Sequence, residues 1–549
     1  MSIFEFSKHP EEDCKRYKAL GWWLGTIIGD LIHKIADAQP AREALIDDRV
    51  RLTYGELRER VNRLAAGWIR LGIQKADTVL LQLPNWAEFV YSYFALQQIG
   101  AIPVLLISGY RQLEINHLCQ LTEAKAWIVP DIYRNVDYGS FVGEIRRANP
   151  QLAHVVSVRA ERASANFTAR LEQLMEKELN SDDKQSIASR RPAPADIAHI
   201  LPSGGTTGLP KAIPRTHNDY ICNVEYLHRA GEMGPNDVAL IVVPVGHNLA
   251  LLNVVGAMFV GYKLVLLDST RPADICNAIQ AEKATYVPTV PSLVKRVLEF
   301  DVLDEHDLTS LKKISAGGEP GTPELVRKTR EKLGASYISE FGMSEGPLCR
   351  SRLDDDLEAI CNSVGKPTCP YDQFKILDEQ GKELPPKVDG ELAAKGPGIF
   401  AGYMKNPGEN KKVFTADGFF RTGDLARIDG SGNIKITGRI KDLIITGGEN
   451  ISPAQVEELL LSHPGVADAA VIGMPDKDLG ERVCAYIQSA RRANPDPEEI
   501  KAFMRSRGAS KFLIPERFEF VDTLPTTGAG KHDKKALRDD IKRKLEREL

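Results

Sequence analysis

This sequence of 549 residues lacks several common patterns that would assign a function directly. Its eight cysteines are scattered and none forms a Cys-x-x-Cys pair, so a zinc site of the common spacing is not expected. There is no Gly-x-x-x-x-Gly-Lys-Ser/Thr loop, and no Gly-x-Gly-x-x-Gly fingerprint at a strand–helix turn. Excess charge is also lacking: a net charge of −4 and a pI near 6.3 argue against electrostatic binding to nucleic acid.

A membrane span is not expected either. The region Ile241–Leu267 is long enough to cross a bilayer, but polar residues that are costly in lipid interrupt it. We therefore expect a buried helix between two strands that lines a cavity. The interrupting residues are Pro244, His247, Asn248, Asn253 and Lys263. The polar, acidic N-terminus has the reverse order of a signal peptide, which together with the scattered cysteines predicts a cytoplasmic protein with reduced thiols.

What the sequence does contain is a cluster of glycine, hydroxyl and lysine residues directly after the apolar run Ile197–Leu201. Glycines let the backbone approach an anion, while hydroxyls and a lysine add donors and positive charge. Leu209 and Pro210 separate the last glycine from the lysine, so this is not a P-loop, and alone it is equally consistent with a flexible surface loop. The candidate phosphate-binding residues are Ser203, Gly204, Gly205, Thr206, Thr207, Gly208 and Lys211.

Apolar runs of strand and helix length alternate around this loop, which predicts α/β architecture with doubly wound sheets. Val79–Leu83, Ala87–Gly100 and Ile102–Ile107 follow as strand, helix and strand. We expect one short strand over Ala44–Leu52, and a surface excursion over the polar segment Ala163–Ala193.

The chain changes character from about residue 363. Short alternating runs such as Gln373–Leu377 and Gly390–Ala394 predict antiparallel strands. Over residues 443–549 we expect a compact α+β domain of ordinary size, whose last element is a solvated helix over Lys534–Leu549.

Five further motifs follow the glycine-rich loop in order: Ser339–Glu345, Phe420–Asp424, Gly438–Asp442, Gly447–Asn450 and Pro525–Lys531. Together with the loop they closely resemble the motifs of the adenylate-forming superfamily of acyl-CoA synthetases, aryl-acid adenylating enzymes and luciferases. The resemblance covers most of the chain. It implies a large ATP- and acid-binding domain over residues 1–439, with a phosphate loop at 203–211 and a small β-barrel-like subdomain at about 363–439. A hinge at 440–442 and a small mobile C-terminal domain over 443–549 complete the expected organisation.

The resemblance also implies a two-step reaction. A carboxylic acid attacks the α-phosphate of ATP to give an acyl-adenylate and pyrophosphate, and a thiol then displaces AMP. A carboxylic acid of pKa ~4 is already ionised at neutral pH, so the difficulty is to bring two anions together. Lys531 is the expected catalytic residue that bridges both anions, and Glu345 is the expected Mg²⁺ ligand, with Thr206 as a second. His247 is the third catalytic candidate.

For the nucleotide, the resemblance implies that Asp424 accepts hydrogen bonds from both ribose hydroxyls and that Arg439 is a further ribose contact. Adenine would lie between the segment 316–320 and the ring of Phe341. Beyond the phosphate loop, the candidate ATP-binding residues are Gly318, Glu319, Phe341, Gly342, Met343, Ser344, Asp424 and Arg439. Lys441 and Asp442 match the family hinge, because Lys531 must withdraw before the thiol arrives.

Within the superfamily, the segments 214–220, 247–248, 341–346 and 352–355 most resemble aryl-acid adenylating enzymes that activate 2,3-dihydroxybenzoate or salicylate. In that group the asparagine matching Asn248 bonds the ortho-hydroxyl of the acid. Leu249 stands where the group commonly has tyrosine, which makes the pocket more apolar. The candidate acid-binding residues are His247, Asn248, Leu249, Ala316, Gly317, Gly342 and Leu348.

The stretch at and after the expected hinge, residues 442–453, resembles acyl-CoA ligases instead. Gly447, Gly448 and Glu449 are the expected coenzyme A contacts. We therefore expect a carboxylate–CoA ligase for a ring-bearing acid, benzoate-like or a cyclohexane- or cyclohexenecarboxylate, with ATP, Mg²⁺ and CoA. The alternative is a stand-alone aryl-acid AMP ligase that loads a carrier protein, and a third hypothesis is a nucleotide-binding protein without catalysis. The sequence leaves a homodimer open.

Overall fold

The computed structural model describes residues 8–160, 166–203, 209–318, 321–446, 449–477, 479–490, 493, 495–507, 509–527 and 531–548. Several predicted site residues lie outside the described residues: Gly204, Gly205, Thr206, Thr207, Gly208, Glu319, Gly447 and Gly448.

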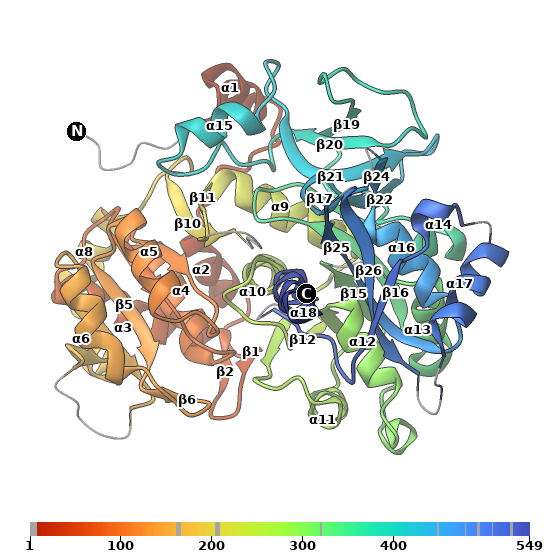
Figure 1. The fold of residues 1–549 in the computed structure, drawn as a ribbon. Helices are drawn as coiled ribbons and strands as arrows, with labels where there is room; N and C mark the ends of the chain where they lie inside the picture. The colour runs from red at the N-terminus through yellow and green to blue at the C-terminus, as the bar shows by residue number, and fades with distance from the viewer. Residues whose placement is uncertain are drawn as a thin grey trace.

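Two large sheets organise the N-terminal part of the chain (Figure 1). The first has a parallel centre with antiparallel strands at both ends, in the order β18 (Lys366–Pro367), β17 (Leu348–Arg350), β16 (Ser336–Gly342), β15 (Lys313–Gly317), β14 (Tyr286–Thr289), β12 (Val238–Ile241), β13 (Lys263–Leu266), β1 (Glu43–Ile46) and β2 (Arg51–Thr53). The second is parallel except for one hairpin, in the order β11 (Ala212–Thr216), β10 (Ile197–Pro202), β4 (Ile102–Leu105), β3 (Thr78–Leu81), β5 (Ala126–Pro130), β8 (His154–Val158) and β9 (Ala169–Arg170).

A layer of helices fills the space between the two sheets. Successive residues of β3 belong to different hydrophobic clusters: Leu80 packs on the outer face of the second sheet, and Leu81 packs in the large core shared with the first. Strands buried on both faces read as continuous apolar runs, which is why the sequence reveals them. The helices of the shared core are α2 (Ile28–Ala38), α3 (Tyr54–Leu71), α4 (Ala87–Gln98), α9 (His217–Ala230) and α10 (Asn248–Val260).

Other helices cover the outer faces. The second sheet is covered by α5 (Gln112–Thr122) and α6 (Gly139–Ala148), and the first by α11 (Pro272–Glu282), α12 (Pro291–Leu298), α13 (Pro323–Leu333) and α14 (Leu357–Asn362). The remaining N-terminal elements are α1 (Glu11–Ala19), β6 (Ile132–Tyr133), β7 (Val136–Asp137), α7 (Leu171–Met175), α8 (Ser181–Ser189) and the 3₁₀ turn η1 (Leu303–Glu305).

The C-terminal third contains two smaller sheets. An antiparallel sheet is formed by β19 (Gln373–Leu377), β20 (Gly390–Lys395), β21 (Phe420–Ile428) and β22 (Ile434–Arg439), with α15 (Pro407–Val413) between the second and third strands. The 3₁₀ turn η2 (Ile440–Asp442) leads to the last domain. That domain contains β23 (Ile444–Thr446), β24 (Glu449–Ile451), α16 (Pro453–Leu461), β25 (Val466–Asp476), β26 (Gly480–Ser489), α17 (Pro497–Ser506), η3 (Lys511–Leu513), β27 (Arg517–Phe520) and α18 (Lys534–Glu548).

The predicted fold class is confirmed, and Ile241–Leu267 does form a buried helix between two strands. The single strand expected over Ala44–Leu52 is wrong. It is two strands, because the Asp47 carboxylate accepts hydrogen bonds from the backbone N–H groups of Arg49 and Val50, both at 2.9 Å, and turns the chain. Within the described residues no helix is long and apolar enough to cross a membrane.

The segment Ala163–Ala193 is only partly a surface excursion. Its helix α8 buries no residue, but Leu171 of α7 is fully buried and packs in the shared core. Leu174, Met175 and Ile187 pack on the same core while partly exposed. Low average hydrophobicity hid these anchoring residues, since a few apolar side chains have little weight in a polar window.

Candidate active site

Lys531 reaches from the C-terminal domain onto the first sheet. Lys531 and Thr527 share two hydrogen bonds: the Thr527 N–H donates to the Lys531 carbonyl at 2.7 Å, and the Lys531 N–H donates to the Thr527 hydroxyl at 3.3 Å. The aliphatic end of the side chain crosses Gly318, where a Cβ atom would lie 2.9 Å from Lys531 Cε. Gly318 also has a φ of +93°, so both its conformation and its lack of a side chain are required here. The lysine charge acts on His247 and Asp424.

Asp424 and Arg439 face each other on adjacent strands β21 and β22, in direct register. The Arg439 Nε–H donates to Asp424 Oδ1 at 2.9 Å, and the aspartate is only 3% exposed. Burial raises the pKa of the Asp424 carboxyl, and the charges of Arg439 and Lys531 oppose that rise. Asp424 therefore keeps one oxygen engaged by Arg439, an internal contact that the sequence did not predict.

Glu345 lies in the turn between β16 and β17. The turn is pressed against a second segment: the Phe400 N–H donates to the Glu345 carbonyl at 2.7 Å, and a Cβ atom on Gly346 would collide with the carbonyl of Gly398. The Tyr403 hydroxyl donates to Glu345 Oε1 at 2.8 Å. Burial raises the pKa of the Glu345 carboxyl, which the Tyr403 hydrogen bond and more distant cations counteract.

Lys211 closes the described end of the phosphate loop. The Lys211 N–H donates to the Ser203 hydroxyl at 2.9 Å, and the Ser203 N–H donates to the Lys211 carbonyl at 2.8 Å, so β10 and β11 hold the two ends of the loop together. The Lys211 ammonium lies 2.5 Å from Glu409 Oε1 and 4.4 Å from the centre of the Tyr403 ring. The loop lysine and the Glu345 carboxylate therefore share Tyr403 as a neighbour.

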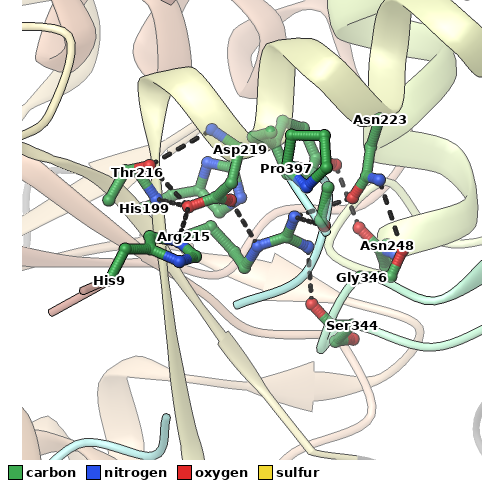
Figure 2. Close-up of polar contacts among 12 residues, drawn as sticks. His9, His199, Arg215, Thr216, Asp219, Asn223, Asn248, Ser344, Gly346 and Pro397 are labelled. Carbon is green, nitrogen blue, oxygen red and sulfur yellow. Dashed lines mark hydrogen bonds and ion pairs between the residues drawn. The ribbon is translucent and has the colours of Figure 1, made fainter. Parts of the chain in front are cut away.

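Arg215 connects the hairpin to the Glu345 turn (Figure 2). Its side chain is completely buried and its guanidinium donates to Asp219 Oδ1 at 2.6 Å, to Asn223 Oδ1 at 2.7 Å, and to the carbonyls of Ser344 and Gly398, both at 2.8 Å. Such a fork of fixed donors suits several acceptors at once. We call Arg215, Asp219, Asn223, Ser344 and Gly398 the Arg215 network.

His247 and Asn248 begin helix α10 beside this turn. The Leu249 N–H donates to His247 Nδ1 at 3.3 Å, and burial together with the charge of Lys531 lowers the pKa of His247 to about 4, so the ring is neutral at physiological pH. Asn248 is 6% exposed: its Oδ1 accepts from the Tyr220 hydroxyl at 3.0 Å and its Nδ2 donates to the Met343 carbonyl at 3.4 Å.

The other predicted residues lie on β15, β16 and β17, in the turn η2 and on β24. Ala316 and Gly317 end β15, and Gly342 is exposed and leaves room for the buried Leu348, whose Cδ2 would lie 2.7 Å from a Cβ atom at 342. Phe341 packs on the core of the antiparallel sheet with part of its ring exposed. At the expected hinge, Asp442 pairs with Arg538 at 3.1 Å and Lys441 is exposed. The backbone of Glu449 pairs with Thr446.

Sequence reasoning did not single out Tyr403 or Glu409, which contact Glu345 and Lys211. Tyr220, which contacts Asn248, was noticed only as part of the segment 214–220. Tyr403 is 58 residues beyond Glu345, and Glu409 is 198 beyond Lys211, so no local spacing could connect them. Arg215 was noticed only as part of a motif, and its burial could not be seen from its type, because arginine is ordinarily exposed.

A family profile described as AMP-binding enzyme matches residues 32–404, and one described as AMP-binding enzyme C-terminal domain matches residues 455–531. The 2,3-dihydroxybenzoate-AMP ligase of Bacillus subtilis is 38% identical over 98% of this chain and 98% of its own length. The salicyl-AMP ligase / salicyl-S-ArCP synthetase of Mycobacterium tuberculosis is 35% identical over 97% of this chain and 94% of its own.

The 2-hydroxy-7-methoxy-5-methyl-1-naphthoate–CoA ligase of Streptomyces carzinostaticus is 34% identical over 97% of this chain and 96% of its own. The solved apo structure of MbtA from Mycobacterium smegmatis superposes with a TM-score of 0.73 at 34% identity, and covers 97% of this chain and 98% of that one. The chain belongs to the adenylate-forming family of AMP-binding enzymes and is an ATP-using, AMP-forming ligase.

Proposed function

We propose that this chain is an aryl-acid AMP ligase, which adenylates an aromatic acid with a hydroxyl group ortho to the carboxylate and passes the acyl group to the thiol of a carrier protein. The observation that carries the acid class is the placement of Asn248, a buried amide that directly follows His247, the residue on which the charge of Lys531 acts. The three relatives described above support it, because each name specifies a hydroxylated aromatic acid or acyl group.

We assign the nucleotide to the space between the two domains. Lys531 would neutralise the acid carboxylate and the α-phosphate together, and Asp424 would accept hydrogen bonds from the ribose with the oxygen that Arg439 does not use. His247, neutral in this environment, would flank the acid without adding charge. The chain would pivot at Lys441 and Asp442, which would break the Asp442–Arg538 pair or carry it along.

Mg²⁺ fits the donor set around Glu345. One buried carboxylate with phosphate oxygens and water suits this ion, and the described residues hold no group of three or more His, Cys, Asp or Glu side chains that would form an all-protein cage. The bound ion would screen the phosphate charges. Within the chain, Tyr403 would fix one carboxylate oxygen and Lys211 would contact the outer phosphates once Glu409 releases it.

Acid-dependent exchange of labelled pyrophosphate into ATP tests the first step. We expect exchange with salicylate and 2,3-dihydroxybenzoate at least about 10-fold more efficient than with benzoate, since an unpaired buried amide is costly. We expect cyclohexanecarboxylate to be poorest. Asn248→Ala should remove the preference, while Asn253→Ala, in the same helix and bonded to the Leu249 carbonyl, should keep it. Best exchange with the alicyclic acid would contradict the proposal.

A second acceptor, coenzyme A, is favoured by the likeness of residues 442–453 to acyl-CoA ligases and by the relative named as a CoA ligase. Thioester formation from the preferred acid should therefore be measured in parallel with free CoA and with a phosphopantetheinylated aryl carrier protein. We expect the carrier protein to be the better acceptor. Efficient transfer to CoA alone would replace the proposed acceptor and leave the adenylation step intact.

A further inference from the structure

We propose that Tyr220 is a specificity-determining positioning residue: it holds the Asn248 amide so that an N–H group faces the acid, and the site then selects a hydrogen-bond acceptor and rejects a donor at the ortho position. The inference rests on the proposed function, because it concerns how the same acid is distinguished from close analogues. It goes further by assigning the polarity of the pocket to a residue that would not touch the substrate.

The orientation of the amide follows from its two partners. The Met343 carbonyl can only accept a hydrogen bond, so the nitrogen of Asn248 must face it, at 3.4 Å. The oxygen must then face Tyr220, whose hydroxyl can donate, at 3.0 Å. Burial raises the pKa of Tyr220 far above its ordinary value, so this hydroxyl keeps its proton at every working pH. The amide nitrogen carries two hydrogens, and the long bond to Met343 uses one of them.

Tyr220 is itself fixed, which makes the selection rigid. The side chain is completely buried in α9. The ring of His199 meets it edge to face, with centroids 4.2 Å apart and an interplanar angle of 87°, and the guanidinium carbon of Arg215 lies 5.3 Å from its ring centre. His199 is bonded in turn to the Tyr93 hydroxyl at 3.0 Å. No rotation of Tyr220 is available without disturbing these contacts, so its hydroxyl stays directed at Asn248.

The chemical consequence separates two acids of nearly equal size. The hydroxyl of salicylate donates its proton to its own carboxylate, so its oxygen lone pairs remain free to accept from Asn248. The amino group of anthranilate has its lone pair delocalised into the ring, so it accepts poorly. One of its N–H groups would instead face the N–H group of Asn248. Two buried donors that face each other both lack an acceptor, and this costs far more binding free energy than the absence of one contact.

The test compares the efficiency of pyrophosphate exchange, kcat/KM, for salicylate and anthranilate. We expect the wild-type protein to favour salicylate by about 10- to 100-fold. Tyr220→Phe keeps the ring contacts but removes the donor to the amide oxygen, so only the long bond to Met343 still orients the amide, and the ratio should fall to within about threefold of unity. Tyr54→Phe is the matched control: it removes a buried hydroxyl that donates to the Ala257 carbonyl at 3.0 Å, at the other end of α10, and should leave the ratio unchanged.

A ratio that survives in Tyr220→Phe, or a wild-type protein that uses both acids equally, would overturn the inference alone. Exchange with neither acid, nor with other benzoates, would overturn the proposed function and the inference with it. If Tyr220→Phe does not fold, the wild-type protein still tests the polarity that Tyr220 is proposed to set: 2-fluorobenzoate, which can only accept, should be used better than anthranilate, and the opposite order would overturn the inference.

Discussion

Asp372 shows how one residue can tie the stability of the site to pH. Its carboxyl is 6% exposed, and Oδ1 accepts from the Gly398 N–H at 3.1 Å while Oδ2 is buried without a hydrogen-bond partner. Burial raises the pKa of Asp372 to about 7, although the hydrogen bond from the Gly398 N–H and the nearby charge of Arg215 lower it in part. The Gly398 carbonyl also accepts a hydrogen bond from Arg215. The Asp372 carboxyl therefore lies next to the Arg215 network that supports the Glu345 turn.

We expect the free energy of unfolding to fall as the pH rises from 4 to 7, because the folded state keeps the Asp372 proton that the unfolded chain has already lost. At about 1.4 kcal/mol per pKa unit, a rise from 3.8 to about 7 corresponds to a loss on the order of 4 kcal/mol. Asp372→Asn keeps the acceptor for Gly398, so it should match the wild type near pH 4 and exceed it above pH 7. Urea unfolding at several pH values measures this.

The control for this prediction is Asp417→Asn. Asp417 is exposed and its pKa is lowered by hydrogen bonds from Lys375 and Thr415, so this variant should gain nothing at high pH. Equal pH profiles for the wild type and Asp372→Asn would show that the carboxyl at residue 372 is ionised in the folded protein at pH 5.

At the scale of elements, the Arg215 network joins β11, α9, the Glu345 turn and the segment before Phe400. β11 and α9 follow each other directly, but Ser344 in the Glu345 turn and Gly398 before Phe400 lie 129 and 183 residues beyond Arg215. Figure 2 shows Arg215 bonded to Ser344 across this distance. Asp219 also closes the start of α9, where its carboxylate accepts from the N–H and the hydroxyl of Thr216. The ion pair therefore fixes both the beginning of a helix and the turn that carries the expected magnesium ligand.

We expect Arg215→Ala to lower the free energy of unfolding by about 3–5 kcal/mol, because it leaves the buried Asp219 carboxylate without its ion-pair partner and the carbonyls of Ser344 and Gly398 without this donor. Lys328→Ala is the matched control: its pair with Glu324 has the same i,i+4 spacing but is exposed, so its loss should cost at most about 0.5 kcal/mol. Denaturant titrations compare the two. Similar losses in both variants would contradict a central role for the network.

Local patterns were sufficient for the sheets and insufficient for the polar connections between them. Runs such as Val79–Leu83 were correctly predicted because a strand buried on both faces must be apolar throughout. The turn at Asp47 was missed because one side chain, rather than apolar periodicity, divides the strand. The pairing of Arg215 with Ser344, or of Tyr403 with Glu345, depends on how distant segments fold together. Motif resemblance singled out Asp424 and Lys531 as candidates without revealing that Arg439 occupies one oxygen of the aspartate.

For the whole molecule, the main question is what the C-terminal domain contributes. In this structure it places Lys531 across Gly318, and further contacts join the two parts: the Lys295 ammonium donates to the Ala467 carbonyl, and the Ser452 hydroxyl donates to the Thr437 carbonyl at 2.6 Å. In the proposed reaction, a lysine at this place would help to bring two anions together but would also occupy space that the thiol needs. We therefore infer that this arrangement serves adenylation and that another serves thioester formation.

The two half-reactions should separate in Lys531→Ala. We expect it to lose acid-dependent pyrophosphate exchange by at least about 100-fold, since it removes the charge that draws carboxylate and α-phosphate together. Thioester formation from supplied aryl-adenylate should stay within about threefold of the wild type, because in that step the lysine has no anion to bridge. Lys534→Ala, three residues along and paired with Glu457 at 2.7 Å inside the same domain, should keep both activities. Equal loss of both half-reactions in Lys531→Ala would mean that the lysine serves one fixed arrangement of the site, and domain alternation would then have no support from this residue.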